Sequence, residues 1–305
     1  MFRSWSLTME AVIATPERVK RKSGAGIFLS PAVIILLIWS LIPLVLTLWY
    51  SFQNYNLVDP TLKGFAGFSN YVYLLTDPDF LYALLNTVLL VLGVLVISVG
   101  GGVLLAVLYD QDFFGRGIAR VLVISPFFVM PTVSALLWKN LMLHPIYGVY
   151  SAFMRAIGLQ PIDWLAHYPM QTVMMIVAWE WLPFAVLILL TAVQSLDHEQ
   201  KEAARMDGAG PIARFRYIIL PHLSRAITVV IMIETIYLLT VFAEISVTTS
   251  GGPGVASTNL AFLIYSRALL QFDIGGASAG GVIAIIIANI IAAFLVRAVA
   301  RNLEA

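Results

Sequence analysis

Three acidic residues lie inside long apolar stretches of the chain, namely Glu180, Glu234 and Glu244. A charge at membrane depth is costly, so such residues are candidates for binding a solute or an ion, or for moving a proton. Acid–base or nucleophilic catalysis would need a second reactive group at the same depth. The chain has no cysteine, and its 4 histidines all lie in polar connecting segments. These observations disfavour a membrane enzyme such as an intramembrane protease, and we predict no catalytic residue and no metal site.

Aromatic side chains accompany two of these acids at helical spacing. Trp181 and Phe184 follow Glu180, and Tyr237 lies one helical turn after Glu234. Aromatic rings cover the C–H faces of a polyhydroxylated ligand, and carboxylates accept hydrogen bonds from its hydroxyl groups. We predict a substrate pathway lined by Val177, Glu180, Trp181, Phe184, Glu234, Tyr237 and Val241. The alternative is that the acids pair with backbone groups or with another subunit and only hold helices together.

The composition indicates that lipid surrounds the elements that carry these residues. Of 305 residues, 60% are hydrophobic and 11% are charged, with a mean hydropathy of +0.90. Soluble globular domains carry about 25% charged residues. Because spanning segments must satisfy their own backbone hydrogen bonds, long apolar stretches predict an all-α membrane protein. A net charge of +1 argues against nucleic acid as a partner.

Six apolar stretches are long enough to cross a bilayer, which takes about 20 residues. We predict helices at about 27–50, 84–108, 120–142, 170–194, 226–248 and 274–297. They form a transmembrane domain of residues 27–298, between an N-terminal segment, 1–26, and a tail, 299–305. The first stretch has full spanning length and no small-residue cleavage site after it, so we predict an uncleaved helix rather than a signal peptide.

Basic residues predict the orientation, because cytoplasmic loops of membrane proteins carry an excess of lysine and arginine. Six spans put both termini on one side. With the N-terminus in the cytoplasm, all but four of the 18 basic residues lie on the inner side. The four on the outer side are Lys63, Lys139, Arg155 and Arg267. We therefore expect both termini in the cytoplasm and a multi-pass membrane protein.

Residues 195–224 form an unusually long connection between the fourth and fifth spans, since joining two helices needs only a few residues. Asp197 is a good N-cap, and Gln200 three residues later completes a start like a capping box. Gly208 is a natural helix stop. We expect a second short helix after it, ended by Pro221 before the fifth span.

Two short helices at the membrane surface form an element that a soluble partner can grip. Small side chains such as Ala203 and Ala204 let the partner approach closely, while Glu202 and Asp207 offer charges. The alternative that the residues alone leave open is a solvated amphipathic loop.

The spacing of residues in this loop matches a known pattern. The Glu-Ala-Ala triplet at 202–204 is followed by Gly208, then by Ile218 and by the Leu-Pro pair at 220–221. This order resembles the EAA loop of binding-protein-dependent ABC importer permeases, which implies the type I importer permease fold. In that family the loop docks into a groove on a separate ATPase subunit. The resemblance implies ATPase-coupling roles for Glu202, Ala203, Ala204, Asp207 and Gly208.

The resemblance also implies a location in the bacterial inner membrane and a set of partner proteins. A second homologous permease subunit, two copies of a cytoplasmic ATPase that bind ATP and Mg²⁺, and a periplasmic solute-binding protein would complete the importer. No cofactor is expected in this chain. The glycine-rich turn at 251–254 lacks the following Lys-Ser/Thr of a phosphate loop.

Other runs are similar to the carbohydrate branch of that family, the maltose-permease type. Residues 249–260 look like its outer-loop signature, and the runs 125–132 and 251–259 look closest to permeases for polyols such as mannitol and sorbitol. We expect outer-loop or gating roles for Glu244, Gly251, Gly252, Pro253 and Asn259. The binding protein would deliver the sugar or polyol at the loops 51–80 and 249–258.

Two alternatives stay open for the transported solute and its driving force. The same permease role for a charged sugar derivative, such as a sulfosugar glycoside, would need basic groups from the partner subunit. An ion-coupled secondary transporter would use the buried acids as ion sites, but it would usually show repeated halves with matching broken helices. No such repeat is found in the sequence.

Overall fold

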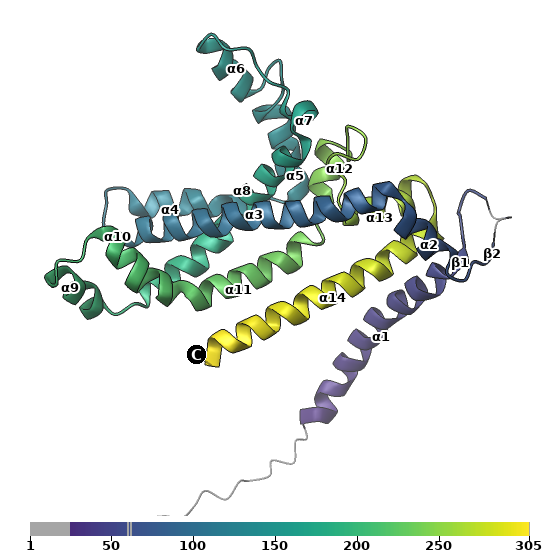
Figure 1. Ribbon diagram of the computed structural model, residues 1–305, viewed down its shortest axis with the longest axis horizontal. Coiled ribbons are helices and arrows are strands. Elements are labelled where there is room, and N and C mark those ends of the chain that lie inside the picture. Colours follow the sequence, from purple (N-terminus) through teal and green to yellow (C-terminus); the bar gives the residue numbers. More distant parts are fainter. Residues whose placement is uncertain (1–24, 60, 62, 305) are drawn as a thin grey trace, which may run out of the picture. The chain divides into compact units, whose positions relative to one another are not determined.

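The computed structural model describes residues 25–59, 61 and 63–304, and most of this part is helical (Figure 1). The chain falls into two units, residues 1–46 and 47–305. Helix α1 (Ala25–Ser51) begins in the first unit and ends in the second. The expected N-terminal segment 1–26 lies outside the described residues, apart from the first two residues of α1.

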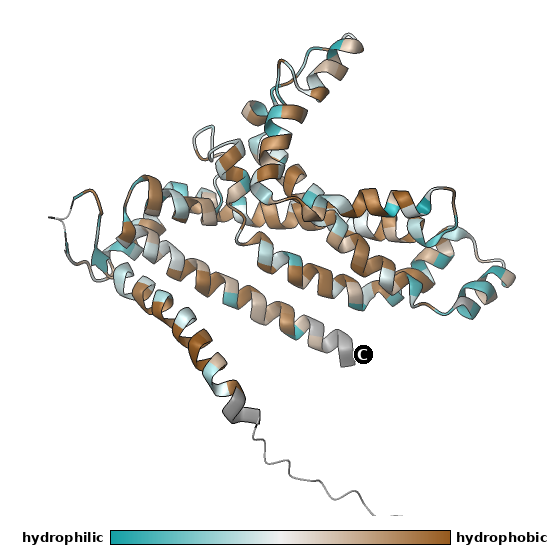
Figure 2. Ribbon diagram, turned by 180° about the vertical axis from the view of Figure 1, so that it is seen from behind, coloured by the Kyte–Doolittle hydropathy of each residue, from teal (hydrophilic) through white to brown (hydrophobic). Residues whose placement is uncertain are grey.

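Five helices among the described residues are long and apolar enough to cross a membrane. They comprise Leu29–Ser51 of α1, α3 (Pro78–Asp110), α8 (Pro169–Gln194), the continuous helix Pro211–Leu238, and Ile274–Ala298 of α14 (Ile274–Glu304). Figure 2 shows apolar residues along these helices. The predicted all-α membrane architecture is therefore confirmed, and a sixth span is present if a bent pair of helices crosses the membrane as one.

That bent pair replaces the straight helix expected at 120–142. It comprises α4 (Arg116–Ile124) with the 3₁₀ turn η2 (Ser125–Phe128), and then α5 (Pro131–Leu137) with the π-helical turn η3 (Trp138–Met142). The two halves meet at an angle of 103°. A residue before proline is disfavoured in the helical conformation. Met130, before Pro131, is accordingly extended at φ −63° and ψ 139°, which separates the halves.

The expectation that Pro221 ends a short helix is wrong. Helix α10 (Pro211–Arg214), the π-helical turn η4 (Phe215–Ile219) and α11 (Leu220–Leu238) form one continuous helix. A proline inside an α-helix clashes with the carbonyl four residues earlier. Here the Leu220 N–H donates to the Phe215 carbonyl five residues earlier, so the turn widens just before the proline ring.

The fifth predicted span, 226–248, is divided in the structure. α11 ends at Leu238, and a short helix, α12 (Ala243–Thr248), follows after a break. The remaining elements are β1 (Gln53–Asn54) paired antiparallel with β2 (Gly64–Phe65), α2 (Ser69–Thr76), α6 (Val149–Ala156), α7 (Trp164–His167), α9 (His198–Met206), α13 (Leu260–Tyr265) and the π-helical turn η5 (Ser266–Leu270).

The centre of the second unit is the pair α3 and α8, which lie side by side (Figure 1). Glycines allow this close approach, because a Cβ built on Gly102 would lie 2.8 Å from the Ala185 Cβ, and one on Gly101 would lie 2.9 Å from Leu182. Helix α11 packs against both α3 and α8. The acids and aromatic residues of interest are thus carried by helices that touch one another.

Candidate functional site

Helix α9 carries the Glu-Ala-Ala triplet, and its ends follow the sequence signals. The N-cap Asp197 accepts a hydrogen bond from the Glu199 amide at 3.0 Å, so the cap reaches the second helical residue rather than Gln200. Gly208 ends the helix with φ of +79°, the left-handed conformation typical of a helix stop. No described atom lies within 4 Å of a Cβ built on Gly208, so this turn is open to an approaching partner.

Two large apolar side chains are exposed among the polar residues of α9 and the turn after it. Met206 and Ile212 are 88% and 82% exposed, and Ala203 and Glu202 are also exposed. Ala204 is the member of the triplet that faces inward, at 9% exposed. Met206 and Ile212 are thus apolar side chains that a docking partner could cover.

Four aromatic rings gather where α8, α11 and η2 meet. The rings of Trp181 and Tyr237 lie 4.2 Å apart between centroids, and those of Trp181 and Phe184 lie 5.6 Å apart. Phe127 from η2 stacks on Phe184 at 6.1 Å and meets Trp181 edge-on at 5.9 Å. We call these four residues the aromatic cluster. It unites three of the residues that the sequence placed on a substrate pathway.

Two of the three acids lie next to this cluster and next to each other. Glu180 on α8 and Glu244 on α12 face one another, with Tyr237 and Ser134 beside them. Both carboxyl groups are buried, at 5% and 1% exposed. One oxygen of each has no hydrogen-bond partner among the described residues, and neither has the Ser134 hydroxyl. Such a group of buried acceptors offers unfilled hydrogen-bonding capacity.

Glu234 lies apart from that pair. The Ser98 hydroxyl of α3 donates to its Oε2, whereas its Oε1 has no hydrogen-bond partner in the described part of the chain. The one-turn spacing from Glu234 to Tyr237 therefore does not bring the two side chains to the same neighbours: Glu234 faces α3 and Tyr237 faces α8.

The two valines of the predicted pathway are core residues in this conformation. Val177 and Val241 are 0% and 2% exposed and belong to one hydrophobic cluster with Trp181 and Tyr237. The partly exposed members of the predicted set are Trp181, Phe184 and Tyr237. The aromatic rings, rather than the valines, are thus the residues that a solute can reach here.

Residues 249–259, which we call the glycine loop, are fastened to α3. The Asn86 amide donates to the carbonyls of Val255 and Thr258 at 3.0 and 2.9 Å. The Thr87 hydroxyl accepts from the Leu260 amide at 2.9 Å. Two adjacent residues of α3 therefore hold the second half of the glycine loop and the first residue after it.

Inside the loop, Gly251 and Asn259 have distinct structural tasks. Gly251 has φ of +84°, and a Cβ there would lie 2.4 Å from the Thr258 hydroxyl oxygen. Asn259 is fully buried, caps α13 through the Phe262 amide at 2.8 Å, and donates to the Val241 carbonyl at 2.6 Å. Asn259 thereby ties the glycine loop to the break between α11 and α12.

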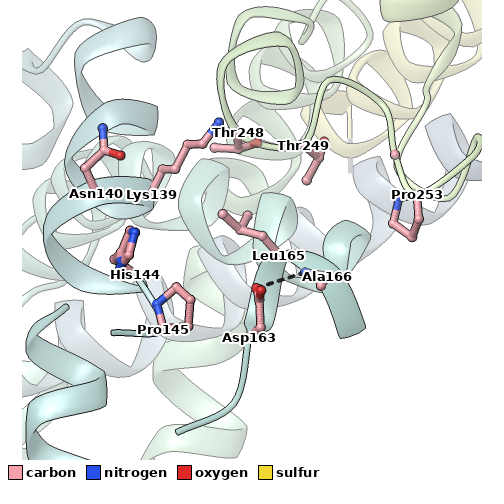
Figure 3. A pocket seen from close by; sticks show the side chains of 11 residues that line it. Lys139, Asn140, His144, Pro145, Asp163, Leu165, Ala166, Thr248, Thr249 and Pro253 are labelled. Carbon is pink, nitrogen blue, oxygen red and sulfur yellow. Dashed lines mark hydrogen bonds between the residues drawn. The ribbon is translucent and has the colours of Figure 1, made fainter. Parts of the chain in front are cut away.

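A pocket of about 500 Å³ lies between the glycine loop and the segment that follows the bent pair (Figure 3). Lys139 borders it and donates to the Val247 carbonyl at 2.8 Å. Asp163 on the facing segment caps α7 through the Ala166 amide, the dashed line in Figure 3. The other residues that line the pocket are Asn140, His144, Pro145, Leu165, Thr248, Thr249, Gly252 and Pro253.

Several residues at these sites were not among the sequence candidates. Phe127 completes the aromatic cluster, Ser98 and Ser134 accompany the acids, and Asn86 holds the glycine loop. The two serines are small polar residues within apolar stretches, and this pattern alone does not say which acid each one meets.

A comparison with protein families places most of the chain in a single match. Residues 78–305 match the family described as binding-protein-dependent transport system inner membrane component. This range contains both the aromatic cluster and α9.

Individual relatives extend the match towards the N-terminus. A probable ABC transporter permease protein, y4oQ of Sinorhizobium fredii, is 33% identical over 88% of this chain and 87% of its own length. The trehalose/maltose transport system permease protein MalF of Thermococcus litoralis is 30% identical over 87% and 89%. The sulfoquinovosyl glycerol transport system permease protein SmoG of Agrobacterium fabrum is 30% identical over 85% and 84%.

A solved structure has the same fold. A chain of a bacterial ABC transporter involved in the import of the acidic polysaccharide alginate superposes with a TM-score of 0.77 at 24% identity, covering 91% of this chain and 95% of that one.

Proposed function

Because this chain belongs to the family of binding-protein-dependent transport system inner membrane components, we propose that it is the permease subunit through which an ABC importer carries a neutral sugar or polyol. The aromatic cluster beside Glu180 is the observation that supports this solute class. Faces of aromatic rings suit the C–H groups of a sugar, and unfilled carboxyl acceptors suit its hydroxyl groups. The chain is a transport subunit of the inner membrane rather than an enzyme.

Trp181, Phe184 and Tyr237 are the proposed sugar-contacting rings, with Glu180 and Glu234 as hydrogen-bond acceptors. Val177 and Val241 belong to the hydrophobic cluster against which Trp181 and Tyr237 pack. The relative from Thermococcus litoralis is named for trehalose and maltose, which are neutral sugars. Glu244 faces Glu180 and adjoins the glycine loop, which suits a gating role.

A charged sugar derivative is a second candidate, because the relative SmoG is named for sulfoquinovosyl glycerol. Another relative is named for sn-glycerol-3-phosphate, an anionic polyol derivative. The residues described around the aromatic cluster are acidic or neutral. An anion would therefore need arginine or lysine from the partner subunit, and the neutral solute is favoured.

We further propose the assembly in which this permease acts. It pairs with a second, homologous permease subunit, and two cytoplasmic ATPase subunits bind the ATP and Mg²⁺. A periplasmic binding protein delivers the solute at the loops 51–80 and 249–258. The pocket between Lys139, Asp163 and the glycine loop lies beside the second of these loops and can receive a side chain of that protein.

In this assembly α9 is the element on which the ATPase acts. Both termini of the chain and α9 lie on the cytoplasmic side. Its open Gly208 turn and exposed Met206 and Ile212 are the features that suit docking. Closure of the ATPase dimer would pull on residues 197–221. The continuous helix 211–238 would then carry the movement to Tyr237, giving alternating access.

Two measurements test the proposal. Calorimetry on the binding protein that stimulates this importer, with polyols, disaccharides and sulfosugars, identifies the solute, and a neutral ligand is expected.

In a reconstituted importer, Glu202→Ala and Gly208→Val should abolish transport while the protein still inserts. Gly208→Asn is the matched control for backbone strain, since asparagine tolerates the left-handed conformation. Uptake that continues without the ATPase, or that collapses with the ion gradient alone, would instead support a secondary transporter.

A further inference from the structure

Lys201 on α9 reaches away from the exposed side of that helix. Its Nζ donates to Asp110 Oδ2 at 2.8 Å and to the Val193 carbonyl at 3.2 Å. Asp110 is the last residue of α3, and Val193 lies in the last turn of α8. One side chain of α9 therefore contacts the ends of the two helices that pack together at the centre of the unit.

Packing gives α9 little other hold on the described helices. α9 makes no extensive helix–helix contact within the described part of the chain. Short turns join it to α8 at one end and to α10 at the other. Neither connection leads directly to α3, which precedes α9 by some ninety residues of sequence and ends in the groove that α9 and α10 border.

We propose that the Lys201–Asp110 pair is a positioning contact that carries a movement of α9 directly to α3. The inference rests on the proposed coupling role of α9. Helix α3 bears Ser98, which donates to Glu234, and Asn86, which holds the glycine loop. A pull on the end of α3 therefore reaches Glu234 and the glycine loop through α3 itself. It does not have to travel along the continuous helix 211–238 first.

The charges suit a positioning role better than a stabilising one. The two side chains are 21% and 25% exposed, and ion pairs near the surface contribute little to stability. A short bond between opposite charges nevertheless fixes the distance between the elements that carry them. Loss of the pair should leave folding intact and should alter how the two helices move together.

The test is transport against ATP hydrolysis in the importer reconstituted with its ATPase and binding protein. Lys201→Met and Asp110→Asn should each insert and co-purify normally. Each should lower the solute carried per ATP hydrolysed about fivefold or more, the lower end of typical coupling between sites. Lys201→Arg, which keeps the charge and the reach, should restore most of that ratio. The double variant should lose no more than either single variant, because the contact is already broken.

Asp112→Asn is the matched control. Asp112 lies two residues from Asp110, is 95% exposed and pairs with Arg116 at 2.5 Å instead of with α9. It should transport like the unaltered protein.

The outcomes separate this inference from the proposed function. Normal coupling in Lys201→Met, or losses that multiply in the double variant, would overturn the positioning contact while Gly208→Val still abolished transport. If Gly208→Val also transported normally, the coupling role of α9 would itself be wrong.

Discussion

Glu234 illustrates what a single buried side chain retains for function. It is fully buried, and Ser98 satisfies only one of its two oxygens within the described residues. Leaving a buried acceptor unpaired costs about 1–3 kcal/mol. We propose that a hydroxyl group of the solute pairs with the second oxygen when the helices move apart during transport.

Glu234→Gln tests this at the residue scale. Glutamine keeps the shape and can still accept from Ser98, but it presents N–H donors where a second acceptor stood. We expect transport to fall about tenfold, which corresponds to about 1.4 kcal/mol of lost interaction. The measurement is solute uptake by proteoliposomes, with thermal unfolding of the purified protein in parallel.

Ser98→Ala is the control for the structural contact. It should lower the unfolding temperature more than Glu234→Gln does and slow transport less. Wild-type uptake by Glu234→Gln would show that the acid only joins helices.

At the scale of elements, the glycine loop depends on one turn of α3. Asn86 donates to the Val255 and Thr258 carbonyls, and Asn259 connects the same loop to the end of α11. The loop is therefore held between two membrane helices, α3 and α11, rather than being free to follow its own chain neighbours.

Asn86→Ala should loosen the loop without removing it. The carbonyls that lose their donor are partly buried, so we expect a loss of about 1–3 kcal/mol in the free energy of unfolding. The loop should also become open to protease at 253–258, a change that limited digestion followed by mass spectrometry detects. Asn289→Ala removes an exposed asparagine whose side chain, within the described part of the chain, bonds to Ile285 of its own helix, and it should change neither property. Equal effects of the two substitutions would contradict the clamp.

The path of the whole chain through the membrane rests on the bent pair. If residues 116–142 cross as one span, the ends of the pair lie on opposite sides; if they re-enter, both ends lie on one side. The absence of native cysteines makes this measurable with single introduced cysteines.

We expect Asp112→Cys and Met206→Cys to react with an impermeant thiol reagent from the cytoplasmic side, and Ile146→Cys from the opposite side. All three positions are exposed, so side of access rather than burial decides the labelling. The experiment uses right-side-out and inverted membrane vesicles. Labelling of 112 and 146 from the same side would show a re-entrant pair.

The sequence alone determined what local rules control. Apolar length predicted the spanning helices, Asp197 and Gly208 marked the ends of α9, and residue spacing at 202–221 indicated the family. These features depend on neighbours a few positions away, so they can be read without coordinates. The prediction that Pro221 ends a short helix was wrong because the π-helical turn before the proline makes room for its ring. Local rules did not predict that wider turn.

Only the tertiary structure decided which side chains meet. Ser98 and Glu234 are 136 residues apart in the chain, and Lys201 and Asp110 are 91 apart. Helical spacing placed Glu234 and Tyr237 together, yet packing turned one towards α3 and the other towards α8. Such contacts arise from how whole helices pack, through glycines such as Gly102 and breaks such as Met130–Pro131, and no local pattern encodes the partner.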